Sequence, residues 1–354
     1  MFLLEDYDYH LPENLIAHYP QADRDHSRLL FLRRNTTRMT HHRFFELENL
    51  LHADDVLVVN NTAVVPGRLF GKKETGGNVE VLILNFGQAV KDQEDANNLT
   101  CECLINASKR PKDGSRIDFS PDLFATVMGF SQGICLVRFT ARKPLSDILK
   151  DIGHVPLPPY IKRSSRQEGL FDDSASYQTV YASSEGAIAA PTAGLHFTED
   201  LLGKLKAKGV KIVEITLHVG YGTFVPVRES DIRKHRMHGE WFSISKKSAD
   251  ILNAAKANGT RIVAVGTTSI RTLEYAANED GILSGGQGNC DLYIYPGYRF
   301  KFVDAVITNF HLPKSTLLML VSAFTGRENM LSAYEEAIAN QYRFYSYGDA
   351  MLIG

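Results

Sequence analysis

One pattern occurs four times in the second half of the chain: an apolar run passes into a short segment of small and polar residues. Three of these segments are followed directly by helical spacing. This alternation is typical of βα units, whose strands lie parallel in one sheet and whose carboxyl ends form an edge where ligands bind. We therefore expect an enzyme, with three histidines and several hydroxyls converging on one site. The segments are residues 190–197, 218–224, 266–269 and 309–316.

The hydrophobic spacing around these segments predicts an α/β fold, with a mostly parallel sheet and flanking helices. Thr198 is a good N-cap for a helix at 201–208, and Gly209 is placed to end it. A second helix is predicted at 249–257, and a short buried one around 317–321. Four apolar runs predict buried strands at 55–60, 210–217, 261–265 and 304–308.

The hydrophobic pattern changes between residues 62 and 144, where short runs typical of strands follow one another without a predicted helix between them. Turn signals such as Gly76-Gly77 and Asp113-Gly114 separate the runs, which predicts a small antiparallel β-barrel. We therefore expect a discontinuous large α/β domain at 1–61 and 145–354, with residues 62–144 as an inserted β-barrel domain. The barrel strands are predicted at 67–70, 79–84, 100–105, 116–119, 123–128 and 133–139.

Composition is that of a soluble globular protein. Of 354 residues, 44% are hydrophobic and 23% charged, and the formal net charge is −2, which argues weakly against a protein that coats nucleic acid. No apolar run reaches the roughly 18 residues that span a bilayer, and acidic residues stand where a secretory signal would be basic. We expect a cytoplasmic protein, not bound to membranes. Its cysteines are expected to be reduced: Cys101, Cys103, Cys135 and Cys290.

Two of the polar segments carry a histidine beside glycines. His196 follows Gly194 in a loop of small residues that leads into a helix N-terminus, which favours an anion. The alternative is a tightly packed loop around a satisfied histidine. The stretch from His218 through Gly220 and Gly222 lacks the third glycine of a dinucleotide fingerprint. We expect its backbone to lie against a ring or ribose, with His218 as a candidate base.

Further candidates have competing interpretations. His235, His238 and Glu240 have metal-like spacing, but no motif supplies further ligands, so we expect no metal. Glu240 is better placed as a ribose partner or general base. The hydroxyl-rich turn at Thr267 and Thr268 could bind a ligand or simply cap a helix. The later stretch Asn309-Phe310-His311 puts an amide, an aromatic ring and an imidazole on one proline-stiffened loop.

Taken together, these stretches resemble the S-adenosylmethionine:tRNA ribosyltransferase-isomerase family of queuosine biosynthesis, over essentially the whole chain. Departures are minor: Gly239 stands where serine is expected, and Tyr221 occupies a variable position. Many matching blocks in the same order indicate a family far more specifically than any single block does. The blocks are 11–12 with 16–17, 60–62 through 66–69, 156–160, 177–181, 190–197, 218–220 with 222–224, His238 with Glu240, 266–269 with Arg271, 309–313 with 315–316, and 347–351.

The resemblance implies an unusual reaction. S-adenosylmethionine serves as a ribosyl donor and is consumed as a substrate, so no separate cofactor is expected. The ribosyl carbons pass to 7-aminomethyl-7-deazaguanine (preQ1) at the wobble position of a tRNA and rearrange to give epoxyqueuosine, with release of adenine and methionine. The implied partners are S-adenosylmethionine and this tRNA, and the protein is expected to act as a monomer.

The resemblance also leads to a hypothesis about roles. The sulfonium acidifies the adjacent C5′ hydrogens, so one positioned base could start the reaction. We expect His196 and His218 to share the proton transfers, Glu240 and Thr268 to hold the ribose, and Asn309 and His311 to line the pocket. The three catalytic candidates are thus His196, His218 and Glu240. The residues predicted to bind substrate are Asn60, Asn61, Arg68, Tyr177, Gln178, Thr192, Gly194, Gly220, Gly222, Thr223, His238, Thr267, Thr268, Arg271, Asn309, Phe310, His311 and Asp349.

Two other classes remain open at this point. One is an S-adenosylmethionine-dependent RNA methyltransferase, against which the missing glycine-rich first loop speaks. The other is a tRNA-binding protein without catalytic activity that uses the β-barrel, against which the histidines at strand ends speak. For the enzyme, we expect the wobble base to be flipped into the cleft between the domains. Either the barrel or residues 162–166 could grip the tRNA.

Overall fold

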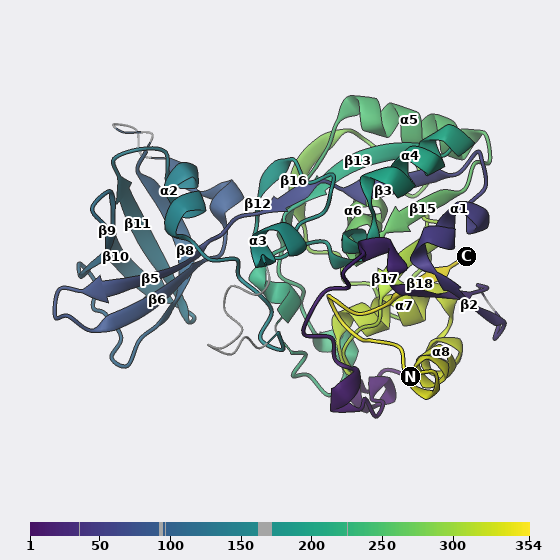
Figure 1. Cartoon of the computed structure of the whole chain (residues 1–354), viewed down its shortest axis with the longest axis horizontal. Coiled ribbons are helices and arrows are strands. Elements are labelled where there is room, and N and C mark those ends of the chain that lie inside the picture. The colour runs from purple at the N-terminus through teal and green to yellow at the C-terminus, as the bar shows by residue number, and fades with distance from the viewer. Residues whose placement is uncertain (35, 92–94, 96, 162–171, 225) are drawn as a thin grey trace.

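A computed structural model describes residues 1–34, 36–91, 95, 97–161, 172–224 and 226–354, without the side chains of residues 223 and 224. A nine-stranded sheet forms the centre of the larger part of the molecule (Figure 1). In spatial order its strands are β16 (Gly286–Cys290), β14 (Glu240–Ile244), β13 (Lys211–Leu217), β3 (Val56–Asn60), β15 (Ile262–Val265), β17 (Ala305–Asn309), β18 (Ala350–Ile353), β1 (Arg28–Leu32) and β2 (Met39–Arg43).

The middle of this sheet is parallel. β13, β3, β15 and β17 are neighbours that all run in one direction, and their central residues are buried on both faces, as in other parallel sheets. β14 and β16 continue the sheet in antiparallel fashion on one side, and β18 pairs antiparallel with β17 on the other. The α/β prediction is therefore confirmed, with the parallel pairing concentrated at the centre of a mixed sheet.

Helices cover both faces of the sheet, as the alternation of side chains along β3 requires. Leu57 and Val59 point into a cluster with α1 and α4, whereas Val56 and Val58 point into the cluster of α5, α6, α7 and α8. The predicted cap is confirmed, because the Thr198 hydroxyl accepts from the Leu201 N–H at 3.1 Å. The helices are α1 (Leu47–Leu50), α4 (Glu199–Lys208), α5 (Lys246–Ala257), α6 (Gly266–Ala276), α7 (Thr316–Thr325) and α8 (Arg327–Ala339).

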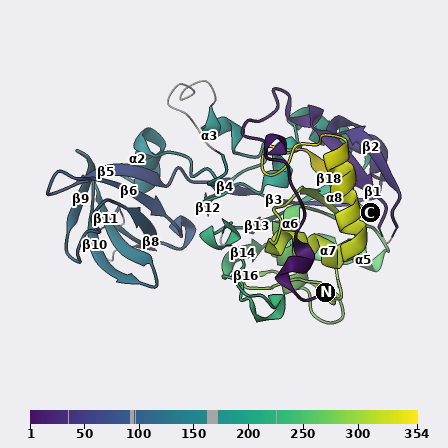
Figure 2. The same cartoon turned by 90° about the horizontal axis from the view of Figure 1, so that it is seen from below.

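A closed antiparallel barrel stands beside the large sheet, as predicted (Figure 2). Six strands close on themselves because β8 pairs with both β6 and β11, and β7 (Val90–Lys91) adds to β8. Alternate residues fill the interior, Cys101, Cys103 and Cys135 among them. Around the barrel the strands are β11 (Ile134–Ala141), β10 (Leu123–Ser131), β9 (Arg116–Ser120), β5 (Arg68–Lys73), β6 (Asn78–Ile83) and β8 (Leu99–Asn106).

Three short elements connect the two parts. β4 (Thr62–Val64) and β12 (Ser184–Ala187) form a separate two-stranded parallel sheet, and α3 (Asp173–Ser176) precedes β12. The apolar side of α2 (Leu145–Ile152) packs against the barrel core. The domain limits of 62 and 144 stay a prediction, and the contacts of α2 favour a return to the large unit after Ile152.

One expectation about the sheet is wrong. The segment at 190–197 follows β12, and β12 pairs with β4 rather than joining the large sheet. The segment still reaches the common edge, because its 3-10 helix η6 lies next to β17. No helix within the described ranges is long and apolar enough to cross a membrane. The 3-10 helices are η1 (Leu4–Tyr7), η2 (Glu13–Leu15), η3 (Arg24–His26), η4 (Phe44–Glu46), η5 (Phe86–Gln88), η6 (Thr192–His196), η7 (Tyr221–Phe224) and η8 (Ile232–Lys234).

Candidate active site

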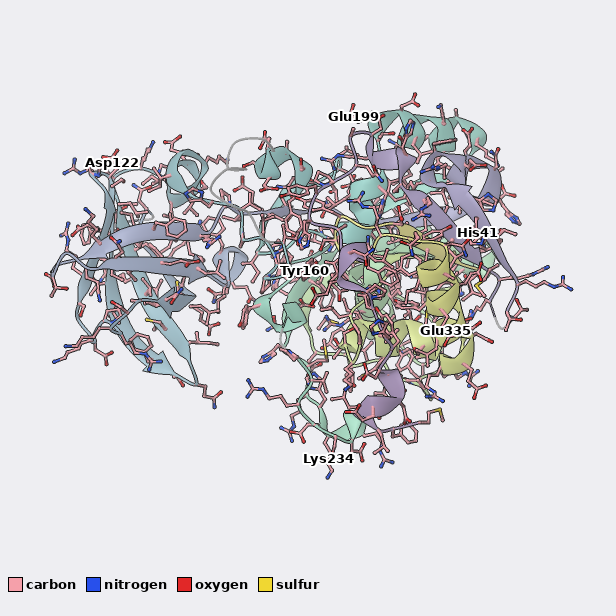
Figure 3. The ribbon with its side chains drawn as sticks, turned by 60° about the horizontal axis from the view of Figure 1, so that its bottom comes forward. His41, Asp122, Tyr160, Glu199, Lys234 and Glu335 are labelled. Carbon is pink, nitrogen blue, oxygen red and sulfur yellow. The ribbon has the colours of Figure 1, made fainter. Side chains whose placement is uncertain are left out.

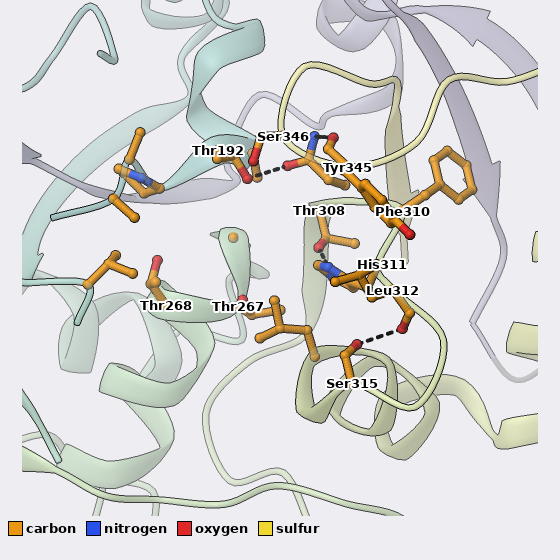
Figure 4. Close-up of a pocket in the computed structure, with 18 of the residues that line it drawn as sticks. Thr192, Thr267, Thr268, Thr308, Phe310, His311, Leu312, Ser315, Tyr345 and Ser346 are labelled. Atoms are coloured by element: carbon orange, nitrogen blue, oxygen red, sulfur yellow. Dashed lines mark hydrogen bonds between the residues drawn. The ribbon is translucent and has the colours of Figure 1, made fainter. Parts of the chain in front are cut away.

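A pocket lies at the carboxyl ends of β13, β15 and β17 (Figure 4). The space inside it, counted together with the solvent in its open mouth, is about 750 Å³. Segments far apart in the sequence line it. They supply Tyr160, Tyr177, Ala189, Ala190, Pro191, Thr192, Ala193, Val219, Gly266, Thr267, Thr268, Thr308, Asn309, Phe310, His311, Leu312, Ser315, Leu317, Tyr345 and Ser346.

Hydroxyl groups dominate the polar part of this pocket. The hydroxyl oxygens of Tyr177 and Thr268 are buried and have no hydrogen-bond partner among the described residues. Leaving a buried polar group unpaired costs about 1–3 kcal/mol. Two other hydroxyls bond within the site: Thr192 donates to the Asn309 side chain at 3.0 Å, and Ser315 donates to the Leu312 carbonyl at 2.7 Å. A ligand hydroxyl or ring nitrogen could supply the missing hydrogen bond to the Thr268 hydroxyl.

Asn309 connects the pocket to groups behind it. Its amide oxygen accepts from Thr192, and its amide nitrogen donates to His196 Nε2 at 3.1 Å and to the Tyr345 carbonyl at 3.2 Å. Because Nε2 accepts, the proton of the neutral imidazole lies on Nδ1, which then donates to the Ser27 hydroxyl at 2.7 Å. Both nitrogens of His196 are thus occupied by protein groups.

His196 itself faces a second, smaller cavity that it shares with Ser27 and Arg24. Its ring stacks on Phe44 with centroids 5.0 Å apart. Burial, with a smaller contribution from Arg343, lowers the pKa of His196 to about 3. The imidazole is therefore neutral near pH 7, and it reaches the main pocket through Asn309.

His311 is the imidazole that lines the main pocket within the described part of the chain. Its Nε2 lies 2.9 Å from the Thr308 hydroxyl, and its backbone N–H donates to the Tyr334 hydroxyl at 2.8 Å. Burial lowers the pKa of His311 to about 3. The ring is therefore a neutral hydrogen-bonding group at physiological pH.

A cleft between the barrel and the large sheet contains His218. Its Nδ1 lies 2.8 Å from the Thr62 hydroxyl, and its ring stacks on Trp241 with centroids 4.8 Å apart. Burial lowers the pKa of His218 to about 4. The cleft also includes Tyr221 and residues of the barrel, and Val219 lines both the cleft and the main pocket.

Glu240 lies at the cleft in a buried ion pair. One carboxylate oxygen accepts from the Gly220 N–H at 2.8 Å, and the other pairs with Arg271. Arg271 is held in turn, because it donates to the carbonyls of Cys290 and Leu292, each at 3.0 Å. The carboxylate thus fixes the backbone of the loop after β13 next to the cleft.

Comparison with known proteins shows the family to which the chain belongs. A family model described as "Queuosine biosynthesis protein" matches residues 4–353. The chain belongs to this family. Relatives named S-adenosylmethionine:tRNA ribosyltransferase-isomerase are 48% identical in Syntrophotalea carbinolica and 47% identical in Trichlorobacter lovleyi, each match covering 99% of both chains. The crystal structure of S-adenosylmethionine tRNA ribosyltransferase from Thermotoga maritima is 35% identical, with a TM-score of 0.55, and the match covers 99% of this chain and 100% of that one.

The expected convergence of three histidines on one pocket is not found in this family member. His311 lines the main pocket, His196 lies behind it, and His218 lies in the cleft. The reason is that η6 is not carried by a strand of the large sheet, so the side chain of His196 enters from behind the strand ends. His238 is exposed at the cleft, and the side chain of Thr223 lies outside the described residues.

Several polar residues predicted to bind substrate are hydrogen-bonded to protein backbone in the structure. The Asn60 side chain bonds both the N–H and the carbonyl of Leu217 at 2.9 Å. Gln178 bonds both backbone groups of Val64, at 2.9 and 3.2 Å. Asp349 accepts from the backbone N–H groups of Arg28 and Arg343, each at 2.8 Å. Their side chains therefore fasten distant segments together.

Two further predicted residues pair with side chains outside the main pocket. Asn61 accepts from Thr216 at 2.7 Å, and Arg68 donates to Glu80 at 2.6 Å at the start of the barrel. Among the predicted glycines, Gly194 packs closely enough that an added Cβ would lie 2.1 Å from the Tyr181 hydroxyl. Gly222 approaches His238 in the same way, at 2.8 Å.

The main pocket also contains residues that are not in the predicted set of site residues, namely Tyr160, Tyr345, Ser346 and Thr308. Figure 3 labels Tyr160 on the side of the large unit nearest the barrel in that view. A signal for Tyr160 was available, because it ends the block 156–160 that contributes to the family resemblance. Tyr345 lies two residues before the block 347–351.

The zinc-like spacing of His235, His238 and Glu240 does not produce a metal site in the described chain. No group of three His, Cys, Asp or Glu side chains gathers there with metal-binding geometry. Glu240 is paired with Arg271 instead, and the His235 ring packs edge-on against Tyr293.

Proposed function

We propose that this chain transfers the ribosyl group of S-adenosylmethionine to 7-aminomethyl-7-deazaguanine at the tRNA wobble position and isomerises it, giving epoxyqueuosine, adenine and methionine. The observation that carries the proposal is the end-to-end family match over residues 4–353, together with relatives that share nearly half of their residues with this chain. The hydroxyl-rich pocket supplies a place for the donor.

The main pocket suits S-adenosylmethionine in several respects. The helix α6 begins at its wall with Gly266, and Ser315, the N-cap of α7, lies there as well. Free amides at a helix N-terminus favour a carboxylate such as that of the methionine part. Threonine hydroxyls can bond the ribose. The unpaired Thr268 hydroxyl is the group that a ribose hydroxyl would satisfy, in keeping with the role expected for it.

The cleft is proposed to hold the wobble base. It is lined by Tyr221 and Trp241, whose rings can stack on an extruded base. The cleft and the main pocket adjoin at Val219. A donor in one and an acceptor in the other would be neighbours, which a direct transfer of the ribosyl carbons requires.

Proton transfers are assigned to histidines that are neutral near pH 7. His218 lies on the cleft side, with its Nδ1 fixed by Thr62, and His311 lies on the donor side, with its Nε2 fixed by Thr308. We assign His196 a positioning role, because its contact with the pocket runs through Asn309. Glu240 is assigned to the cleft, where it holds the Gly220 amide in place.

A product assay tests the function. The purified protein is incubated with S-adenosylmethionine and a tRNA carrying 7-aminomethyl-7-deazaguanine, after which free adenine, free methionine and the mass of the digested wobble nucleoside are measured. Release of adenine and methionine with a heavier nucleoside is expected. S-adenosylhomocysteine with a methyl-sized increment would indicate a methyltransferase, and tight tRNA binding without turnover would indicate a binding protein.

We also propose that the enzyme acts as a monomer in the cytoplasm, on free S-adenosylmethionine and tRNA. Sedimentation at micromolar concentration should give the mass of one chain, both alone and with a single tRNA bound. A dimer under the assay conditions would contradict this part of the proposal.

A further inference from the structure

We propose that the main pocket recognises the positive sulfonium of S-adenosylmethionine with the aromatic rings of Tyr160 and Tyr345, in place of a carboxylate counter-ion. The inference rests on the proposed function, since it concerns the donor of that reaction. It assigns a chemical role to two residues outside the predicted set of site residues.

The first argument is the charge of the pocket wall. Within the described ranges, no Asp, Glu, Lys or Arg side chain lines the pocket. A cation that enters such a site loses solvation and finds no opposite charge. The amides at the start of α6 present the positive end of a helix dipole, which favours the donor carboxylate but not its sulfonium. The cation therefore needs another partner.

The second argument is that the titratable groups of the wall are neutral. Burial raises the pKa of Tyr160 to about 12 and raises the pKa of Tyr345 even further. Neither phenol ionises near pH 7. Burial lowers the pKa of His311 to about 3, so that ring carries no charge either. What remains to attract a cation is the negative face of an aromatic ring.

The third argument is the geometry of the two rings. Their centroids are 4.7 Å apart and their planes are inclined by 54°. Two touching, inclined rings form a corner that suits a compact cation. A purine held between two rings would instead need parallel ring faces separated by the thickness of the base. The Tyr160 hydroxyl is hydrogen-bonded to Ser346, which holds that ring beside its neighbour.

The fourth argument is the backbone of Tyr345, which has a φ of 72°. A bulky residue rarely adopts this left-handed conformation, and such strain persists where surrounding bonds enforce it, often at ligand clamps. Here the Tyr345 N–H donates to the Phe310 carbonyl at 3.1 Å. Its own carbonyl accepts from Gly348 at 2.9 Å and from Asn309 at 3.2 Å. The network around Asn309 thus sets where the Tyr345 ring lies.

The test compares S-adenosylmethionine with S-adenosylhomocysteine, which keeps the adenine and ribose but has a neutral thioether. Dissociation constants are measured by calorimetry for the wild type and for Tyr345→Leu, Tyr345→Phe and Tyr160→Leu. We expect each leucine variant to weaken S-adenosylmethionine binding by about tenfold, while its affinity for S-adenosylhomocysteine changes much less. Tyr345→Phe keeps the ring and should keep the preference for the cation.

Equal losses for the two ligands would overturn the inference, because they would mean that the rings shape the pocket or stack on adenine. Tyr275→Leu, on a half-exposed ring outside the pocket, is the matched control and should leave both affinities unchanged. Should Tyr345→Leu not fold, Tyr160→Leu decides the matter. A wild-type protein that binds no S-adenosylmethionine and releases no adenine refutes the proposed function itself, whereas an active enzyme without cation preference refutes the ring assignment alone.

Discussion

Asn309 shows how a neutral side chain can organise this site, whose described wall contains no charged side chain. One side-chain amide joins Thr192, His196 and the Tyr345 carbonyl, so the pocket wall and the layer behind it share a hydrogen-bond network. Such networks are strong when every member is paired and costly when one is not. The hydroxyls of Thr268 and Tyr177 are the unpaired groups in the described part of this wall.

Replacing Thr268 with valine should separate binding from stability. We expect S-adenosylmethionine affinity to fall by about five- to tenfold, the value of one hydrogen bond, while the free energy of unfolding stays equal or rises. Thr192→Val is the control, because it removes a bond to Asn309 that the protein makes without ligand, and it should lower stability by about 1 kcal/mol. Calorimetry and urea unfolding measure both effects. Loss of stability in Thr268→Val would show that the hydroxyl has a protein partner.

The buried histidines predict how stability depends on pH. In the folded state the pKa of His218 is lowered to about 4 and those of His196 and His311 to about 3. In the unfolded chain each is about 6.5. Below pH 6.5 the unfolded state therefore binds more protons, so the free energy of unfolding should fall as pH drops from 6.5 towards 4, by up to about 1.4 kcal/mol per pH unit for each histidine.

Urea unfolding at several pH values tests this slope. His218→Asn keeps a side-chain hydrogen-bonding group near Thr62 but removes one of the three titrations. The curve between pH 6.5 and 4 should therefore become less steep, while His196 and His311 keep their contributions. An unchanged slope in this variant would mean that His218 is protonated in the folded protein over that range.

At the scale of elements, polar side chains at strand ends hold the sheet in register. Asn60 at the end of β3 bonds the last residue of β13, Leu217, through both of its backbone groups. These bonds replace ladder pairing where two parallel strands separate towards the site. His218 is the first residue after Leu217. The bonds of Asn60 to Leu217 therefore set where the loop that carries His218 begins.

Asn60→Ala should therefore act on stability. It leaves the buried N–H and carbonyl of Leu217 without partners, at a cost of about 2 kcal/mol or more in the free energy of unfolding. Asn61→Ala, at a half-buried position, is the comparison and should cost less. Denaturant unfolding measures both. A normal stability for Asn60→Ala with weakened S-adenosylmethionine binding would restore the substrate-binding role predicted from sequence.

Many helices and strands could be predicted, because the burial of one face leaves a regular spacing of hydrophobic residues in the local sequence. β3, β13, β15 and the six barrel strands lie within a few residues of the expected positions, and so does the helix capped by Thr198. The place of β18 could not be predicted, because four apolar residues carry no sign of which strands they will join. The hydrogen bonds of polar residues such as Gln178 and Asp349 could not be predicted either. Their backbone partners Val64 and Arg28 lie more than 100 positions away in the sequence.

At the scale of the whole molecule, polar side chains form part of the contact between the barrel and the large unit. Gln88 donates to Asn289 at 2.9 Å, and Lys150 pairs with Glu185 at 3.0 Å, in exposed positions where such bonds contribute little. The close part of the contact is made by glycines: Cβ atoms added at Gly87 and Gly186 would meet the His218 ring at 2.7 and 2.5 Å. The distance between the two units thus depends on residues without side chains.

Gly87→Ala should push the barrel away from His218, whose ring is held by Thr62 and Trp241. We expect turnover with the tRNA to fall roughly 10- to 100-fold, with S-adenosylmethionine binding unchanged, because the main pocket contains no residue of the barrel strands. Gly129→Ala is the control on the same barrel, where an added Cβ meets open space. Full turnover in Gly87→Ala would show that the cleft does not need this spacing.

The strand β18 determines the order in which the molecule can assemble. In the described chain, the hairpin of β1 and β2 joins the large sheet through β18, and Arg28 bonds Asp349 across 321 positions. During synthesis the hairpin emerges early and then waits, with an unpaired edge, until residues 350–353 have left the ribosome. Pairings this distant form slowly, and waiting edges promote aggregation. The barrel can close long before, since its six closing strands all lie between residues 68 and 141.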